Sequence, residues 1–230
     1  MKRFWKSAQA IQNDGGWGVE LDGRPLRTPA RKPLSVPTQG LAEAIAGEWN
    51  APEDKIDPSA MPLTGLANAA IDRVAPDRQS FASGIAKYAE ADLACYRAEG
   101  PQGLIDAQAG HWDELLAWGR RRFDVDFRTT SGLLHVDQPP PTMERLAHAV
   151  HALDSYRLAG LLPLVTIGGS LLAALGVLEE AFTPEWAWEA VSVDDRWQLA
   201  QWGSDEEAEK ALANRERDFL AAAQFLQLLD

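Results

Sequence analysis

The stretch LAGLLPLVTIGGSLLAALGVL, from Leu158 to Leu178, contains no charged residue, although 24% of the chain is Asp, Glu, Lys or Arg. Roughly 20 apolar residues are enough to cross a bilayer, so the length of this stretch allows a membrane span. However, no aromatic residue or basic cluster anchors either end. A helix that is apolar on all sides is also typical of the centre of a helical domain. We therefore expect Leu158 to Leu178 to form a buried central helix, with a membrane span as the alternative.

The composition narrows the classes of function. The chain has 230 residues and a net charge of −12, and this length suits one large domain or two small ones. Such a charge argues against nucleic acid or an anionic membrane surface as partner, because phosphate contacts need clustered Lys and Arg. A basic or amphipathic protein surface is the better match. The single cysteine, Cys95, excludes an internal disulfide and fits a reducing compartment.

The first part of the chain has the pattern of a β-hairpin followed by helices. Apolar residues alternate with others from Trp17 to Leu21, which is the period of a half-buried strand. Asp22-Gly23 follows and is a favoured hairpin turn. Further strands are expected at 8–12, 24–28 and 34–36, then a helix capped by Thr38 and a helix over 63–74.

Beyond Pro76, almost the whole chain has a helical period, so Pro76 marks the expected domain boundary. We predict an α+β fold: a small β-rich α/β domain over 1–76, followed by a larger all-helical domain over 77–230 around the buried central helix. In the second domain we expect helices over 104–123 and 185–202, one capped by Thr142, and a final helix capped by Ser204. Pro139 to Pro141 are expected to form a loop.

The helix predicted over 185–202 has apolar residues on two opposite sides. Thr183-Pro184 is a typical helix start, with proline at the first helical position. One of the two apolar rows contains Trp188 and Trp202, with Asp195 in its middle. A helix of this kind packs inward with one side and covers another surface with the other side.

Charged residues interrupt the apolar rows of the two C-terminal helices. Asp194-Asp195 belongs to the first helix, and Arg215 stands in the apolar row of the second. A carboxylate or a guanidinium in an apolar row destabilises the fold unless it is paired. Two interpretations stay open, and both can hold: Asp195 and Arg215 bridge the helices, or one acid of the pair contacts a basic side chain of a partner. Catalysis is not expected, because no nucleophile, metal ligand or cofactor motif is nearby.

Three other patterns give only weak indications of a metal site, a phosphate-binding loop or a reactive cysteine. From their spacing, His148, His151 and Asp154 could share a helical face, but a metal site usually needs a further ligand and supporting hydrogen bonds. They support the alternative of a metal-binding or small-ligand enzyme. Gly168-Gly169-Ser170 lacks the features of a phosphate loop and is better explained by close helix packing. Cys95 is expected to be a small core residue.

Several segments along the whole chain carry a family resemblance. They include GVELDGRPLRTP, IDPSAMPLTGLANAAID, DLACYRAEGP, QAGHWDELLAW, GGSLLAALG and QWGSDEEA. Taken together and in this order, they resemble the ATP synthase assembly chaperones that are specific for the alpha subunit of the catalytic sector. This family occurs in mitochondria and in alphaproteobacteria. The resemblance covers essentially the whole chain, although no single segment is diagnostic of a reaction.

The resemblance implies a chaperone that is not an enzyme and needs no cofactor. It would hold the unassembled alpha subunit and cover the face that later meets the beta subunit. It also implies a small amino-terminal α/β domain, a larger helical domain, and an important acid that falls within Asp194-Asp195. With the apolar rows, this gives Asp194, Asp195, Trp188, Trp202 and Arg215 as the expected client-binding residues. No targeting segment precedes them, so we expect a bacterial cytoplasmic protein; a eukaryotic member would work in the mitochondrial matrix.

Overall fold

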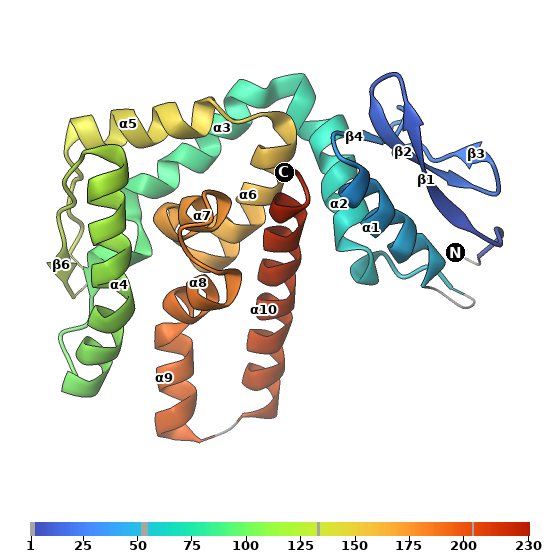
Figure 1. The fold of residues 1–230 in the computed structure, drawn as a ribbon. Helices are drawn as coiled ribbons and strands as arrows, with labels where there is room; N and C mark the ends of the chain where they lie inside the picture. Colours follow the sequence, from blue (N-terminus) through green and yellow to red (C-terminus); the bar gives the residue numbers. More distant parts are fainter. Residues whose placement is uncertain (1–2, 52–54, 133, 204) are drawn as a thin grey trace. The chain divides into compact units, whose positions relative to one another are not determined.

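The computed structural model describes residues 3–51, 55–132, 134–203 and 205–230, except the side chain of Trp202 (Figure 1). The chain divides into two compact units. The first comprises Met1–Arg78, Asp154–Gly160 and Gln224–Asp230, and the second comprises Gln79–Leu153 and Leu161–Ala223. A small strand-containing region is followed by a larger helical part, which confirms the predicted α+β fold. The domain limits 1–76 and 77–230 stay a prediction.

The main sheet is built on an antiparallel hairpin. Its strands are β1 (Ala8–Asn13), β2 (Gly16–Leu21), β3 (Arg24–Pro25) and β4 (Ser35–Val36), and β2 pairs with the other three. Asp22 and Gly23 have φ angles of 49° and 77°, the two positive values that a type I′ turn requires. The predicted turn is therefore confirmed, whereas the return strand is shorter than the expected 24–28.

Helix α1 (Gln39–Asn50) packs against this sheet with Leu41 and Ile45 fully buried. Thr38 begins the helix as predicted, because its hydroxyl oxygen accepts a hydrogen bond from the Leu41 amide at 3.2 Å. The same hydroxyl donates to the carbonyl of Leu228. The last residues of the chain are thereby tied to the first unit.

The backbone remains helical through Pro76. α2 (Pro62–Ala69) continues through a π turn (Ala70–Val74) and a 3₁₀ turn (Ala75–Asp77) into α3 (Arg78–Ala86). Proline lacks an amide hydrogen and crowds the preceding turn of an α-helix. The π and 3₁₀ turns change the hydrogen-bond spacing around Pro76, which lets the helical run continue. The prediction that the helix stops at Val74 is therefore wrong.

The remaining elements are mostly helices. They are α4 (Gln102–Phe123), α5 (Pro140–His151), α6 (Ser155–Gly168), α7 (Leu171–Leu178), α8 (Pro184–Val191), α9 (Val193–Trp202) and α10 (Glu206–Gln227), with a parallel pair of short strands, β5 (Tyr96–Arg97) and β6 (Thr130–Ser131). Within the described residues, none of the helices has both the length and the apolarity to cross a bilayer.

The uncharged stretch forms two helices instead of the expected single one. α6 ends at Gly168, and Gly169 has a φ angle of 68°, a conformation that glycine adopts without steric strain. Ser170 then begins α7, because its hydroxyl oxygen accepts a hydrogen bond from the Ala173 amide at 3.0 Å. All residues from Leu171 to Val177 are buried. The expected burial is therefore confirmed for α7. In α6, Leu162, Pro163 and Ile167 are half-buried and Thr166 is exposed, and the expected continuity of one helix is wrong.

Pro140 and Pro141 start α5 and do not belong to a loop. They occupy the first helical positions, where the missing amide hydrogen of proline has no helical partner to lose. Thr142 lies inside the first turn, and its hydroxyl donates to the carbonyl of Asp126 at 2.7 Å. The predicted proline loop and the predicted Thr142 cap are both wrong.

The helix predicted over 185–202 is interrupted at Ser192. This residue has φ −105° and ψ 9° and separates α8 from α9. Its hydroxyl donates to the Trp188 carbonyl at 2.7 Å, a local bond that competes with regular helical hydrogen bonding. The prediction of one helix with two apolar sides is wrong, although the predicted start at Thr183-Pro184 is confirmed.

Candidate client-binding site

The predicted client-binding residues lie on α8, α9 and α10 of the second unit (Figure 1). The structure describes the side chains of Trp188, Asp194, Asp195 and Arg215, while that of Trp202 lies outside the described part. Three of the four described side chains, Trp188, Asp195 and Arg215, come together. Asp194 has a different neighbour.

Arg215 joins α10 to α9 and to the end of α6. Its Nη1 donates to Asp195 Oδ2 at 2.8 Å, and its Nη2 donates to the Ile167 carbonyl at 3.3 Å. The ion pair expected from the sequence is therefore present. The two side chains keep 41% and 43% of their surface exposed, so solvent screens the pair. Its net contribution to stability is about 1 kcal/mol or less.

Trp188 lies inside the unit, beneath this ion pair. The residue is 3% exposed, and its ring centroid is 5.6 Å from that of Phe219. The guanidinium carbon of Arg215 lies 5.9 Å from the Trp188 ring centroid, which is within cation–π range. In this structure Trp188 therefore positions Arg215 from within.

Asp194 is part of a chain of hydrogen bonds to the segment before α4. Its Oδ1 accepts a bond from Gln108 Nε2 at 2.7 Å, and Gln108 Oε1 accepts a bond from the Ala98 amide at 2.8 Å. Gln108 is 2% exposed. Loss of the Asp194 carboxylate would leave the buried side-chain amide of Gln108 without this acceptor. The free energy of unfolding would then fall by about 1–3 kcal/mol. Asp195 is thus the acid of the pair that is less committed to the fold.

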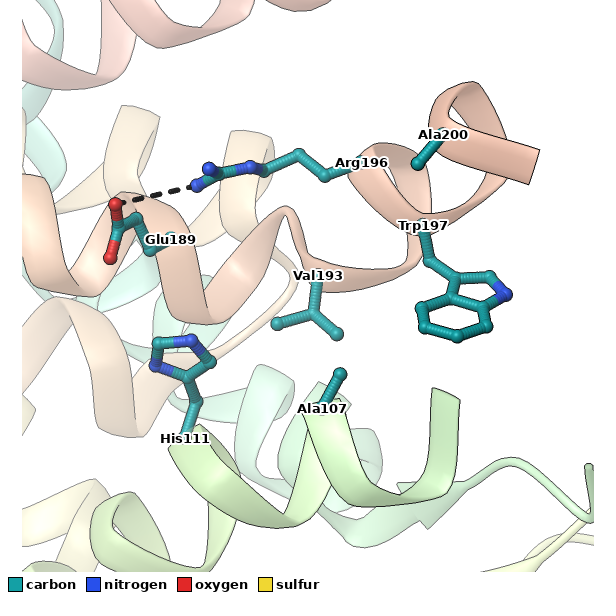
Figure 2. A pocket seen from close by; sticks show the side chains of 7 residues that line it. All are labelled: Ala107, His111, Glu189, Val193, Arg196, Trp197 and Ala200. Carbon is teal, nitrogen blue, oxygen red and sulfur yellow. Dashed lines mark ion pairs between the residues drawn. The ribbon is translucent and has the colours of Figure 1, made fainter. Parts of the chain in front are cut away.

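A pocket of about 300 Å³ lies between α4 and the α8–α9 region (Figure 2). Figure 2 shows His111 projecting from α4, and the Glu189–Arg196 ion pair, 3.5 Å long, across from it. Trp197 forms another wall, and a Cβ added at Gly103 would approach its ring to 2.4 Å. The sequence analysis did not assign this pocket, although the glycine opposite a tryptophan is a signal of such close packing.

A second hollow of about 440 Å³ lies between α9 and the first half of α10. We call it the α9–α10 groove. The residues that line it include Asp195, Leu199, Asp205, Ala208, Ala211, Leu212 and Arg215. Apolar side chains in this lining are accompanied by the charged residues Asp195, Asp205 and Arg215, which we call the rim of the groove, and the Asp195–Arg215 ion pair belongs to this rim. The sequence pattern did not indicate this groove, because a hollow between two helices depends on their packing.

The residues of the alternative metal site have other partners. His151 Nδ1 lies 2.8 Å from Gln79 Oε1, and its Nε2 lies 3.3 Å from Ser83 Oγ. Asp154 accepts hydrogen bonds from the backbone at the start of α6. In the part of the chain that the structure describes, no three His, Cys, Asp or Glu side chains are grouped so that they could hold a metal ion.

Asp92 is a buried carboxylate, 1% exposed, that the sequence pattern did not single out as a functional residue. It accepts hydrogen bonds from the Ala94 amide at 3.1 Å, the Leu172 amide at 3.0 Å and the Ser170 hydroxyl at 2.9 Å. Burial raises the pKa of this carboxyl, and the hydrogen bonds partly offset the effect. The pKa of the nearby Cys95 thiol is also raised, to about 12, mainly by burial and to a smaller extent by the charge of Asp92. Cys95 is buried and therefore belongs to the core, as predicted.

Comparison with known proteins gives consistent matches. Residues 2–120 match the family model described as ATP12 chaperone protein. The chain is 26% identical over 219 residues to the protein atp12, mitochondrial, of Schizosaccharomyces pombe, covering 90% of this chain and 75% of that protein. It is 41% identical to the crystal structure of Atp12 from Paracoccus denitrificans, with a TM-score of 0.94 and coverage of 100% and 98%. An aspartate-to-lysine mutant of the Paracoccus protein matches with 40% identity, the same TM-score and the same coverage.

Proposed function

Because the chain belongs to the ATP12 chaperone family, the family of ATP synthase assembly chaperones that its sequence resembles, we propose that it binds the unassembled alpha subunit of F-type ATP synthase. In this proposal it shields the surface of the alpha subunit that later contacts the beta subunit. We infer the alpha subunit as the client from the resemblance of the sequence segments. We assign no reaction and no cofactor to the chain, and we propose that it acts in the bacterial cytoplasm.

The electrostatics of the second unit support a protein client with a basic surface. The net charge of the chain is −12, and Asp195 keeps 43% of its side chain exposed beside the apolar walls of the α9–α10 groove. Complementary charge steers association and selects partners. A client interface of standard size would bury roughly 1,600 Å² in total. The exposed acid beside an apolar hollow is the single observation that best supports client binding in this region.

Co-expression with the isolated alpha subunit is expected to raise the soluble fraction of that subunit several-fold. The physical reason is that an uncovered subunit interface exposes apolar surface, which promotes aggregation. The measurement is the amount of alpha subunit in the supernatant after centrifugation, with the beta subunit expressed in its place as a control. An alpha subunit that is equally insoluble with and without the chain would contradict the proposal.

Charge reversal of the acidic pair is expected to weaken capture of the client. The double variant Asp194→Lys/Asp195→Lys should bind the alpha subunit at least tenfold less tightly, which corresponds to about 1.4 kcal/mol. Asp195→Asn should account for much of this loss, because the Asp195 side chain is 43% exposed, whereas the Asp194 carboxylate accepts a hydrogen bond from Gln108 within the unit. Affinity is measured by calorimetry, and circular dichroism checks that each variant is folded. Normal client recovery by a folded double variant would refute the acidic contact.

A further inference from the structure

The apolar row of α10 continues beyond the point where the helix packs against its own unit. Phe219 and Ala222 are buried, with exposures of 0% and 1%. About two and three turns before Phe219 in this row, Leu212 and Ala208 are only half-buried and line the α9–α10 groove. Leu199 of α9 faces them across the groove. The groove thus offers apolar surface that the core of the unit does not use.

The rim of the groove has an excess of carboxylates. Asp195 and Asp205 line it. Outside the lining, the first turn of α10 carries Glu206, Glu207 and Glu209, which add to the negative charge of this end of the helix. On the cationic side, Arg215 is already paired with Asp195, and Lys210 is exposed within the same turn of α10. A low-dielectric hollow with an acidic rim attracts cationic groups. A second copy of this chain, at a net charge of −12, would be repelled.

We propose that the α9–α10 groove receives an amphipathic segment of the client, with an apolar side chain between Leu199 and Leu212 and a Lys or Arg at the acidic rim. This inference rests on the proposed function and names the surface and the chemistry of the contact. A volume of about 440 Å³ suits one or two large side chains, and apolar anchors from one helical face are a common way to fill such a groove.

The partner of the Asp195 carboxylate in the Asp195–Arg215 ion pair can be exchanged for a cation of the client. A cationic side chain of the client competes with Arg215 for the Asp195 carboxylate. Arg215 is not left without a partner by this exchange, because its Nη2 also donates to the Ile167 carbonyl and its guanidinium lies over Trp188. Asp195 is therefore the acid that contacts the client, and Arg215 with Trp188 positions it.

Filling the groove tests the inference. Ala211 lines the groove and is exposed, whereas Ala213 is exposed on the same helix outside it. Ala211→Phe is expected to weaken binding of the isolated alpha subunit at least tenfold, and the matched control Ala213→Phe less than twofold. Neither change enters the core, so both variants should keep the circular dichroism of the parent chain.

The charge of the rim is tested separately. Asp205 Oδ1 accepts a hydrogen bond from the Glu207 amide at 3.0 Å and so caps α10; the predicted Ser204 cap lies outside the described residues. Asn caps helices as well as Asp does, so Asp205→Asn removes the charge and keeps the cap. It should weaken alpha-subunit binding and make the affinity less dependent on salt. Asp126→Asn, at a side chain that is 92% exposed elsewhere in the unit, should change neither.

The possible outcomes distinguish a failure of the groove inference from a failure of the proposed function. If the parent chain binds the alpha subunit and Ala211→Phe binds it equally well, the groove inference is overturned while the proposed function stands. If the parent chain does not bind the alpha subunit, both are overturned. If Ala211→Phe instead turns a dimer into a monomer in sedimentation equilibrium, the groove is an interface between copies of this chain, which also overturns the inference.

Discussion

Replacement of Asp92 by alanine is expected to lower the free energy of unfolding by about 3 kcal/mol or more. The change removes the acceptor of the Ala94 amide, the Leu172 amide and the Ser170 hydroxyl. A buried donor without a partner costs about 1–3 kcal/mol, and Asp92 is only 1% exposed. The measurement is urea unfolding followed by tryptophan fluorescence, and a loss below about 1 kcal/mol would contradict this role of Asp92.

Asp92→Asn separates the charge of the side chain from its shape. Burial raises the pKa of Asp92 above its ordinary value, and the hydrogen bonds partly offset this. The folded chain therefore binds this proton more tightly than the unfolded chain does, and the stability contributed by Asp92 falls as pH rises from the ordinary value through the raised one. Asn does not titrate. The loss caused by Asp92→Asn is expected to be largest at acid pH and to shrink toward neutral pH.

Asp154 provides the matched control for this pH dependence. Burial opposes ionisation of its carboxyl, but hydrogen bonds from Arg157 and Tyr156 outweigh burial and lower the pKa. The stability contributed by Asp154 is thus present above its ordinary pKa and is lost as pH falls through the lowered value. Asp154→Asn should therefore cost least at acid pH, the opposite trend to Asp92→Asn. Parallel trends for the two variants would show that burial does not dominate at Asp92.

The features that could be predicted from the sequence are those whose partners are close in the chain. The turn at Asp22-Gly23 needs only two residues with positive φ. Thr38 and Thr183 cap helices by accepting a hydrogen bond from an amide three residues later. Asp195 and Arg215 are 20 residues apart, yet each is a charge in an apolar row of neighbouring helices. Pairing was therefore one of the two interpretations that this placement allowed, and the ion pair is present.

The helix breaks could not be predicted, because the groups that stabilise them are distant in sequence. The residues on both sides of Gly169 and of Ser192 have a helical period, so the pattern alone favours continuous helices. The start of α7 is held by Asp92, 80 residues before its Leu172 partner. The α9–α10 groove depends on how α9 and α10 lie against each other and was therefore not predicted from the sequence, although its apolar row was identified.

Replacement of Trp112 by alanine is expected to lower the free energy of unfolding by about 3–5 kcal/mol, the usual range for a fully buried aromatic residue. Trp112 is 1% exposed and packs beneath the Arg97 guanidinium, whose carbon lies 5.4 Å from the ring centroid. Its Nε1 donates to the Ala190 carbonyl at 2.7 Å. This carbonyl belongs to the last turn of α8, where carbonyls lose their helical partners. Trp112 therefore stabilises the end of α8 as well as filling the core.

Trp112→Phe separates the hydrogen bond from the packing. It keeps an aromatic ring but leaves the Ala190 carbonyl without its donor, so a loss of about 1–3 kcal/mol is expected. Trp118→Phe, at a half-buried position on the same helix α4, should cost less. Because the end of α8 leads directly into α9, Trp112→Phe should also weaken alpha-subunit binding if the break positions Asp195. Equal losses of stability for the two variants would show that the bond to Ala190 contributes nothing.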